Sequence, residues 1–446
     1  MRYEYGRVGQ YRYAGMFFEE FLPELRGTRG VQTYYQMSEN DDTVGAILFA
    51  IQMLMRQVDF TIEPGGPSET DKAAAEFVDS CLYDMANTWQ DTLAEILSFL
   101  TYGWSYHEIC YKRRNGHKRD PDFSSKYDDG LIGWSKLPIR AQDTLFRWEY
   151  KPGTDVLTGM SQMPPPDFGV LTIPLGKALH FRTTSVKNNP EGRSILRTAY
   201  RSWYFKTRIQ EIEGIGIERN LAGFPVLYAP PDLAIWDEHD KKAQEAMDWA
   251  LDIVTGIKQD SKMGIVLPGG ENGWKLELLT GNTSKAVDTN AIIERYDKRI
   301  ATTVLADFVM LGQQSVGSFA LASNKTKIFA LAVGTYLDVI CDVFNSQGIP
   351  RLMELNRNAF AGVTDYPRMV HGDIEDKDLS VLGEFLQRVS AAGIIQPDEQ
   401  IEDYVRREAG LPERLTTESG SADLSIDRPS KITETDQGAV LPGDTE

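Results

Sequence analysis

The feature that most constrains this sequence is a short polar segment, flanked by glycine, between two long helical patterns in residues 286–344. In 287–311 and again in 321–344, apolar side chains recur at steps of three and four, which is the period of one face of an α-helix. The segment between the two runs holds no charged residue and consists of Gly312, Gln313, Gln314, Ser315, Val316, Gly317 and Ser318. A helix of ~25 residues is about 37 Å long, so we expect two long helices that hold this loop away from the body.

The first of these helices carries its charges on the face opposite the apolar stripe. Glu294 and Lys298 lie four residues apart, a spacing that favours an ion pair along a helix. Lys298 and Arg299 form a small basic cluster in the middle of this run. The pattern predicts an amphipathic helix that is packed on one side and exposed on the other.

The net charge limits what this chain binds. Its 446 residues carry a formal charge of −18, and residues 372–446 contribute 18 acidic and 7 basic side chains to it. A protein that grips nucleic acid mainly through phosphates is normally basic. We therefore expect most of the surface to repel nucleic acid, with any basic patch being local.

Cysteines and the N-terminus suggest a reducing, intracellular origin. Cys81, Cys110 and Cys341 are few, odd in number and far apart, which fits neither a disulfide framework nor a cysteine-pair zinc site. The first twenty residues lack the apolar core of a signal peptide. We find no run of about 18 apolar residues, so no transmembrane helix is expected, and we predict a soluble protein or a component of a soluble assembly.

The first 230 residues predict an arm followed by an α+β body. Residues 1–36 hold many aromatic side chains without a clear period, so this arm docks either on its own body or on a neighbouring subunit. Asn115-Gly116 is a strong signal for a hairpin turn. The expected helices are 44–55, 69–85 and 90–100, and the expected strands are 58–62, 105–111, 145–150, 170–173 and 178–183.

The region after residue 193 is mostly helical. In a helix expected over 193–220, five basic residues precede the first acid, Glu211. Basic residues in the first turns oppose the helix dipole, so these side chains either line a DNA path or, as we favour, pair with acids of an adjacent helix or subunit. The other expected elements are a strand at 224–228, a helix at 237–257, a hairpin of 263–267 with 274–279, and helices at 379–392 and 397–409. Pro350 is expected to end the second long helix, and residues from about 413 are expected to be flexible.

The search for catalytic motifs predicts that the chain is not an enzyme and binds no cofactor or metal. It lacks the G-x-x-x-x-G-K-[ST] phosphate loop, and Gly214-Ile215-Gly216 lacks the third glycine of a dinucleotide fingerprint. His107 and Glu108 are neighbours on an expected strand, so their side chains point to opposite faces. With 65 acidic residues, chance carboxylate pairs are certain, and none stands out as a catalytic dyad.

One basic cluster has two readings. Lys112, Arg113 and Arg114 precede the Asn115-Gly116 turn, and His117, Lys118 and Arg119 follow it. Such a tip contacts nucleic acid or an acidic partner, or it is simply a solvated hairpin tip, which is the reading we favour.

An ordered series of segments resembles the portal proteins of tailed bacteriophages, and most closely their Mu-like branch. Together they cover roughly residues 40–410. The segments are 42–62, Leu97 to Gly103 with the strand that contains Glu108, Asn189-Pro190-Glu191-Gly192-Arg193-Ser194 with the helix after it, Phe224-Pro225-Val226, and Arg299-Ile300-Ala301 with the run to Leu311-Gly312.

The resemblance implies an α+β portal-type fold and a ring, usually of twelve subunits, at one capsid vertex. Such a ring docks the large terminase subunit, passes double-stranded DNA during packaging and ejection, and later joins head–tail adaptor proteins. It also contacts the major capsid or scaffold protein, without a membrane, and is assembled in the host cytoplasm. The implied parts are an arm at 1–36, an α/β wing at 37–230, stem helices at 231–257 and 286–311, a small β clip at 258–285, a tunnel loop at 312–320, a long helix returning to the wing or crown at 321–371, a helical crown at 372–412, and an acidic tail at 413–446.

The resemblance also assigns roles to individual residues. Gly312–Ser318 would face DNA as the tunnel loop, and Met263, Pro268 and Trp274 would lie in the partner-docking clip. Lys298 and Arg299 either form a basic ring in the channel or pair between subunits with Asp297 or Glu294. Twelve copies would carry a charge of −216, so that a largely acidic bore lets DNA slide. The alternatives are another head or tail structural protein, such as an adaptor or minor capsid component, and, less favoured, a nucleic-acid-processing enzyme.

Overall fold

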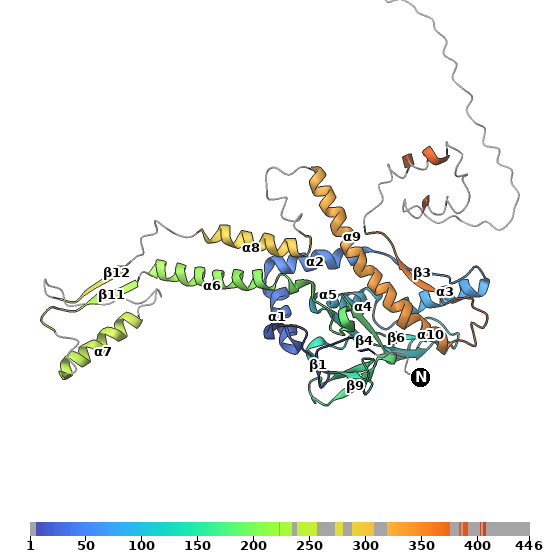
Figure 1. The fold of residues 1–446 in the computed structure, drawn as a ribbon, viewed down its shortest axis with the longest axis horizontal. Helices are drawn as coiled ribbons and strands as arrows, with labels where there is room; N and C mark the ends of the chain where they lie inside the picture. Colours follow the sequence, from blue (N-terminus) through green and yellow to red (C-terminus); the bar gives the residue numbers. More distant parts are fainter. Residues whose placement is uncertain are drawn as a thin grey trace, which may run out of the picture. The chain divides into compact units, whose positions relative to one another are not determined.

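The computed structural model describes residues 6–222, 224–233, 239–256, 273–279, 288–306 and 319–374, together with a few short helical pieces between 383 and 406. The chain divides into two compact units, Met1–Glu375 and Asp376–Glu446. The first unit mixes helices with small antiparallel sheets (Figure 1). The expected α+β class is therefore confirmed at this level.

The expected N-terminal arm is partly a hairpin that packs on its own body. Strand β1 (Arg12–Tyr13) pairs with β2 (Met16–Phe17). The carbonyl oxygen of Gly15 accepts a hydrogen bond from the Trp148 backbone N–H at 3.0 Å, and the Arg12 guanidinium lies 3.6 Å from the centre of the Tyr150 ring. For this hairpin the structure favours docking on its own domain.

The remainder of the expected arm leads into a helix that the sequence reading missed. Helix α1 (Gly27–Asn40) follows a short 3-10 turn at Pro23–Leu25. It contains two glycines and several polar residues with low helix propensity, and its Arg26 N-cap supplies no side-chain hydrogen bond. Tertiary packing of Tyr34 and Met37 stabilises a helix that the local sequence does not predict.

The expected helices of the body are present and begin at side-chain caps. The Asp41 carboxylate accepts a hydrogen bond from Val44 N–H at the start of α2 (Asp42–Gln57). Ser68 forms a capping box with Asp71 at the start of α3 (Glu69–Tyr83). The helix expected over 90–100 is divided into α4 (Trp89–Ile96) and α5 (Ser98–Tyr102). Each cap satisfies backbone N–H groups that a helix start leaves free.

The strands form several small antiparallel sheets. The expected strand 105–111 is divided at Ile109, because its two halves pair with different partners. The pairs are β3 (Phe60–Glu63) with β13 (Arg368–His371), β4 (Trp104–Glu108) with β10 (Ala178–Arg182), and β5 (Cys110–Arg113) with β6 (Ile132–Lys136), while β7 (Leu145–Tyr150), β8 (Leu157–Gln162) and β9 (Leu171–Pro174) form a three-stranded sheet.

The expected tight turn at Asn115-Gly116 is wrong. Strand β5 pairs with β6, so the connection between them is long and irregular. Gly116 has a φ of +68°, as its sequence context suggests, and its N–H donates to the Tyr127 carbonyl at 2.8 Å. The glycine bends the chain there without closing a two-residue loop.

A long helix supplies one wall of the main core. Helix α9 (Phe319–Val343) buries Phe329, Val333, Leu337 and Ile340 in the large hydrophobic cluster. The helical segment Lys327–Leu355 is long enough and apolar enough to cross a membrane, which we did not expect from the sequence. Core helices of soluble proteins can have the same length and composition. The buried side chains show that α9 is packed against the body.

Pro350 does not end this long helix as expected. A π turn at Phe344–Gly348 joins α9 to α10 (Ile349–Leu355), and Ile349 N–H donates to the Phe344 carbonyl. Proline fits here because it lies in the first turn of α10, where its missing N–H is not needed. The wider π turn offsets the two helices without a loop.

Two further helices run side by side, away from the small sheets of the body (Figure 1). Helix α6 (Tyr200–Ala222) packs against α8 (Thr289–Thr303). Between them in sequence lie β11 (Phe224–Tyr228), α7 (Lys241–Gly256) and β12 (Lys275–Leu279), and β11 pairs with β12.

This pairing corrects one expectation. The helix expected over 237–257 is present as α7, but α7 packs against β11, and α8 packs against α6. The strand expected at 274–279 is present as β12 and pairs with β11. Its expected hairpin partner, 263–267, lies outside the described residues, so that hairpin stays a prediction. The long helix at 193–220 was assigned to the wing, and its role in this pair was missed because its apolar face is interrupted by charge.

Some expectations fall outside the residues that the structure describes. These are the loop Gly312–Ser318, Met263 and Pro268 of the expected clip, the tail from 413, and about two thirds of the residues in the helices expected at 379–392 and 397–409.

Candidate functional site

The candidate site is the α6–α8 pair and its attachment to the body. The Phe205 ring on α6 stacks on the Tyr296 ring on α8, with centroids 6.4 Å apart and planes 19° apart. Farther along, the Thr289 hydroxyl donates to the Glu213 carboxylate. Because higher residue numbers on α6 meet lower numbers on α8, the two helices are antiparallel.

One buried lysine anchors this pair to the body. The Lys206 side chain on α6 is 2% exposed, and its Nζ lies 2.6 Å from Asp297 on α8. It also lies 2.9 Å from Asp42 and 3.0 Å from Asp41, at the start of α2. The Thr43 hydroxyl donates to Asp297 Oδ1 at 2.8 Å. Three helices therefore meet around a single ammonium group.

The charges in this cluster stabilise one another. Burial opposes the charged form of Lys206, but hydrogen bonds to Asp297 and Asp42 outweigh it and raise the Lys206 pKa. The hydrogen bond from Lys206 lowers the pKa of Asp42. The lysine is thus held in its charged form.

The same three carboxylates lie close enough together to hold a metal ion. Ligand atoms of Asp41, Asp42 and Asp297 lie within 4.8 Å of one another. The Lys206 ammonium, however, bonds to all three, so it supplies the positive charge that a metal ion would otherwise bring. The contacts of this cluster attach α2, α6 and α8 to one another.

Three of the basic residues from Arg193 onward pair with acids of the same chain, but only Lys206 pairs with an adjacent helix, as we favoured from the sequence. Arg197 pairs with Glu20 of the N-terminal segment (Nη2 to Oε1, 2.7 Å). Arg208 pairs with Glu211 of its own helix at 2.7 Å. The buried Lys206 is therefore engaged within the chain.

The basic cluster around Asn115-Gly116 is not a solvated tip throughout. The Lys112 side chain is 1% exposed and lies 3.1 Å from Asp84. Arg114 is buried and pairs with Asp129 at 2.8 Å. Both readings from the sequence fail for these two residues, since acids distant in sequence and the long connection after β5 enclose them.

Lys298 and Arg299 are exposed on α8. The Arg299 guanidinium lies 5.8 Å from the centre of the Tyr296 ring. Their neighbour Asp297 is already bound by Lys206, which weakens the alternative that Asp297 pairs between subunits. The structure of one chain leaves both basic groups facing solvent.

The distal end of the pair carries a small α/β unit. Trp274, immediately before β12, is half-buried and contacts Trp249 on α7, with ring centroids 5.3 Å apart in an edge-to-face arrangement. Strand β11 begins two residues after the end of α6, and β12 pairs with β11. This unit therefore lies where α6 ends, away from the Lys206 anchor at its start.

A comparison with known families identifies this arrangement. The family model described as "Portal protein of Mu bacteriophage" matches residues 31–411, which is most of the chain. The chain belongs to this portal family. As a portal protein, it is a structural component of the phage particle at the capsid vertex, in a family that is structural and not enzymatic.

Solved structures show a more distant likeness. The portal resembles a chain of the "Virion of native gene transfer agent (GTA) particle" with 11% identity and a TM-score of 0.48. It resembles a chain of the "Neck of empty GTA particle computed with C6 symmetry" with 13% identity and 0.48, and one of the "Neck of native GTA particle computed with C12 symmetry" with 11% and 0.44. Each match covers 86% of this chain and 94% of the other.

Proposed function

We propose that this portal forms a closed ring, of twelve subunits, whose central channel conducts double-stranded DNA into the capsid and later out of it. The observation that carries the proposal, together with membership of the family, is the antiparallel α6–α8 pair that Lys206 ties to the body. A rigid pair of helices, repeated around an axis, makes a wall. The energy for DNA movement comes from a partner ATPase that docks on the ring.

In this proposal α6 and α8 are the stem of each subunit. The distal β11, α7 and β12 form the clip, which includes Trp274 and, outside the described residues, Met263 and Pro268. Helices α1 to α5 and the small sheets of the body form the wing. The chain from α9 to 371 returns to the wing or crown, 372–412 belongs to the crown, and 413–446 is an acidic tail.

Exposed apolar side chains on the stem support packing between copies. Ile212, Ile215 and Ile217 of α6 are 67%, 55% and 53% exposed in the single chain. Apolar side chains along an exposed helix favour association, because burial stabilises the complex by about 25 cal/mol for each Å² of apolar surface removed from water. We propose that the stem of a neighbouring copy covers them.

The bore is proposed to be lined in part by the segment Gly312–Ser318, which connects α8 to α9. Small and uncharged residues favour weak contact with a moving duplex. Lys298 and Arg299 add a local basic ring to a channel that is otherwise acidic. This basic ring slows DNA without stopping it.

The clip is proposed to dock the large terminase subunit during packaging and head–tail adaptor proteins afterwards, while the wing meets the major capsid or scaffold protein. The ring assembles in the host cytoplasm and remains in the virion. No membrane takes part in this proposal.

The test is assembly combined with packaging. Purified protein is imaged by electron microscopy, and the double variant Lys298→Ser/Arg299→Ser is compared with wild type for DNA packaged by cognate terminase into empty heads. We expect rings from both proteins and an altered packaging rate in the variant, with a weaker salt dependence. Failure of the wild type to form rings would overturn the proposal.

A further inference from the structure

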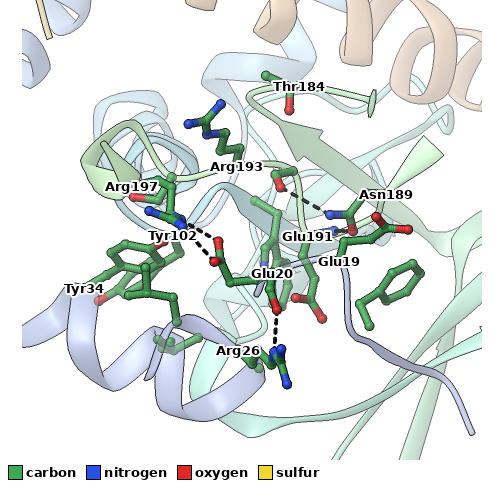
Figure 2. A pocket seen from close by; sticks show the side chains of 18 of the residues that line it. Glu19, Glu20, Arg26, Tyr34, Tyr102, Thr184, Asn189, Glu191, Arg193 and Arg197 are labelled. Carbon is green, nitrogen blue, oxygen red and sulfur yellow. Dashed lines mark hydrogen bonds and ion pairs between the residues drawn. The ribbon is translucent and has the colours of Figure 1, made fainter. Parts of the chain in front are cut away.

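The cations around one pocket of the body are largely occupied by groups of the same chain (Figure 2). In this pocket, which has a volume of about 530 Å³, Arg197 pairs with Glu20 and Lys187 pairs with Glu19. Arg26 donates to the Glu20 backbone carbonyl. The long connection between β5 and β6 shows the opposite situation, because several of its cations are exposed and have no such partner.

This connection closes on itself and has a fixed shape. Gly116 N–H donates to the Tyr127 carbonyl at 2.8 Å, and Ser125 N–H donates to the Gly116 carbonyl at 3.1 Å. Between them, Lys118 N–H donates to Ser124 Oγ at 3.1 Å. A loop that is already ordered by its own hydrogen bonds loses little further conformational entropy when a partner binds.

Two buried cations attach the loop to the body. The Lys112 ammonium lies 3.1 Å from the carboxylate of Asp84, which follows α3 directly. The Arg114 guanidinium donates to the hydroxyl of Ser80 on α3 at 2.8 Å. Arg113 lies between these two residues and is exposed, because successive side chains of a strand point to opposite faces. The inward cations thus fix the loop on α3, and the outward one remains at the surface.

The exposed cations of this loop have no acidic partner within ion-pair distance among the residues that the structure describes. They are Arg113, Lys118, Arg119 and Lys126. Lys126 donates to a backbone carbonyl, that of Tyr83, at 3.0 Å. Two acids of the loop, Asp120 and Asp128, are exposed and likewise lack an ion pair. Four cations against two acids leave a local excess of +2, on a chain whose net charge is −18.

We propose that this loop is a second DNA contact of the portal, which binds the phosphate backbone of duplex DNA on the body of each subunit. The contact rests on the proposed function, in which duplex DNA passes through the ring. A duplex carries one negative charge per ~1.7 Å of its axis, and ammonium and guanidinium groups bind phosphate through charge-assisted hydrogen bonds. Contacts to phosphate carry no sequence information, so the loop binds duplexes of any sequence. Because the surrounding surface is largely acidic, DNA is held at the loop and repelled around it.

The experiment measures how tightly the purified, intact protein binds a fluorescein-labelled duplex of random sequence, by fluorescence anisotropy between 50 and 200 mM NaCl. The loop variant is Arg113→Ser/Lys118→Ser/Arg119→Ser. We expect it to bind at least tenfold more weakly than wild type at 50 mM NaCl. The slope of log K against log salt should become shallower by about 3, because each lost phosphate contact removes about 1.

The matched control is Lys72→Ser/Arg147→Ser/Arg357→Ser, which removes the same amount of positive charge elsewhere on the chain. Each of these three residues pairs with a nearby glutamate, so none offers a free cation to DNA. This variant should bind the duplex as wild type does. Circular dichroism confirms that both triple variants are folded.

Electron microscopy of the same samples separates the loop contact from the proposed function. Rings from wild type and loop variant that bind the duplex equally well would overturn the loop contact and leave the proposed channel intact. Absence of rings from wild type would overturn the proposed function, whereas a tenfold loss of binding in the loop variant would still support the loop contact.

Two further outcomes would overturn the loop contact. One is the absence of saturable duplex binding by wild type at 50 mM NaCl. The other is displacement of the labelled duplex by poly-L-glutamate at a lower concentration of negative charge than by unlabelled duplex, which would indicate an acidic protein as the partner of this loop.

Discussion

Lys206 Nζ lies 2.6 Å from Asp297 Oδ1 and joins α6 to α8 within one subunit. Two further carboxylates, from Asp41 and Asp42, bind the same ammonium. The lysine near the start of α6 therefore holds α6 and α8 together and fixes them to the start of α2.

Lys206→Met is predicted to destabilise the protein by about 3 kcal/mol, because removal of one member of a buried charge cluster leaves the others uncompensated. Chemical denaturation monitored by circular dichroism measures this loss. Arg208→Met is the matched control on the same helix. Its partner Glu211 is exposed, so the cost should stay below about 1 kcal/mol. Equal effects of the two substitutions would contradict the role assigned to Lys206.

Gly192 makes a close backbone contact that no other residue tolerates. Its φ is +55°, and a Cβ at this position would lie 2.2 Å from the Gly103 carbonyl oxygen. We predict that Gly192→Ala costs about 3 kcal/mol or more, through clash and strained backbone together. Gly153→Ala isolates the backbone effect, since φ is +71° there and the space is open, and should cost about 1 kcal/mol. Similar melting temperatures for the two variants would show that the close contact is absent in solution.

Glu191 predicts an unusual dependence of stability on pH. Burial raises its pKa from 4.5 to about 7 in the folded state, so the folded protein holds this proton more tightly than the unfolded chain does. The stabilisation is full below about pH 4.5 and is lost as the pH rises through 7. Glu191→Gln should therefore gain stability relative to wild type from pH 5 to pH 8, by up to about 3 kcal/mol. Urea denaturation at the two pH values measures the difference, and a constant difference would refute the raised pKa.

Trp274 and Trp249 hold α7 against the distal strands. Trp274→Ala is expected to speed hydrogen exchange at the amides of β12 and α7 at least tenfold, because local opening there loses its main aromatic contact. Exchange in the α6–α8 pair near Lys206 should not change. Rings should still form, and terminase should bind them more weakly if the distal unit is the clip. Unchanged exchange in β12 would show that this contact contributes little.

Local signals in the sequence were sufficient for much of the body. Asp41, Ser68 and Thr88 start helices with side-chain caps, and alternation of apolar residues located both ends of β7, Leu145 and Tyr150. Capping and alternation act over a few residues, so one sequence displays them.

Long-range pairing was not predictable in the same way. Lys206 binds Asp297, which lies 91 positions later in the sequence, and the sequence around either residue does not indicate its partner. The series of bases after Arg193 indicated that acidic partners were needed, but it did not identify α8 or the start of α2 as their source. For that reason the sequence reading paired α7, and not α6, with α8. The loop Gly312–Ser318 stays a prediction, since it lies outside the described residues.

Cryo-electron microscopy of the purified protein tests the central claim most directly. The account predicts closed rings in which α6 and α8 of each copy line a central hole wide enough for duplex DNA, with Lys206 bonded to Asp297 in every subunit. Monomers at high concentration, or rings that carry α6 and α8 on their outer rim, would contradict it.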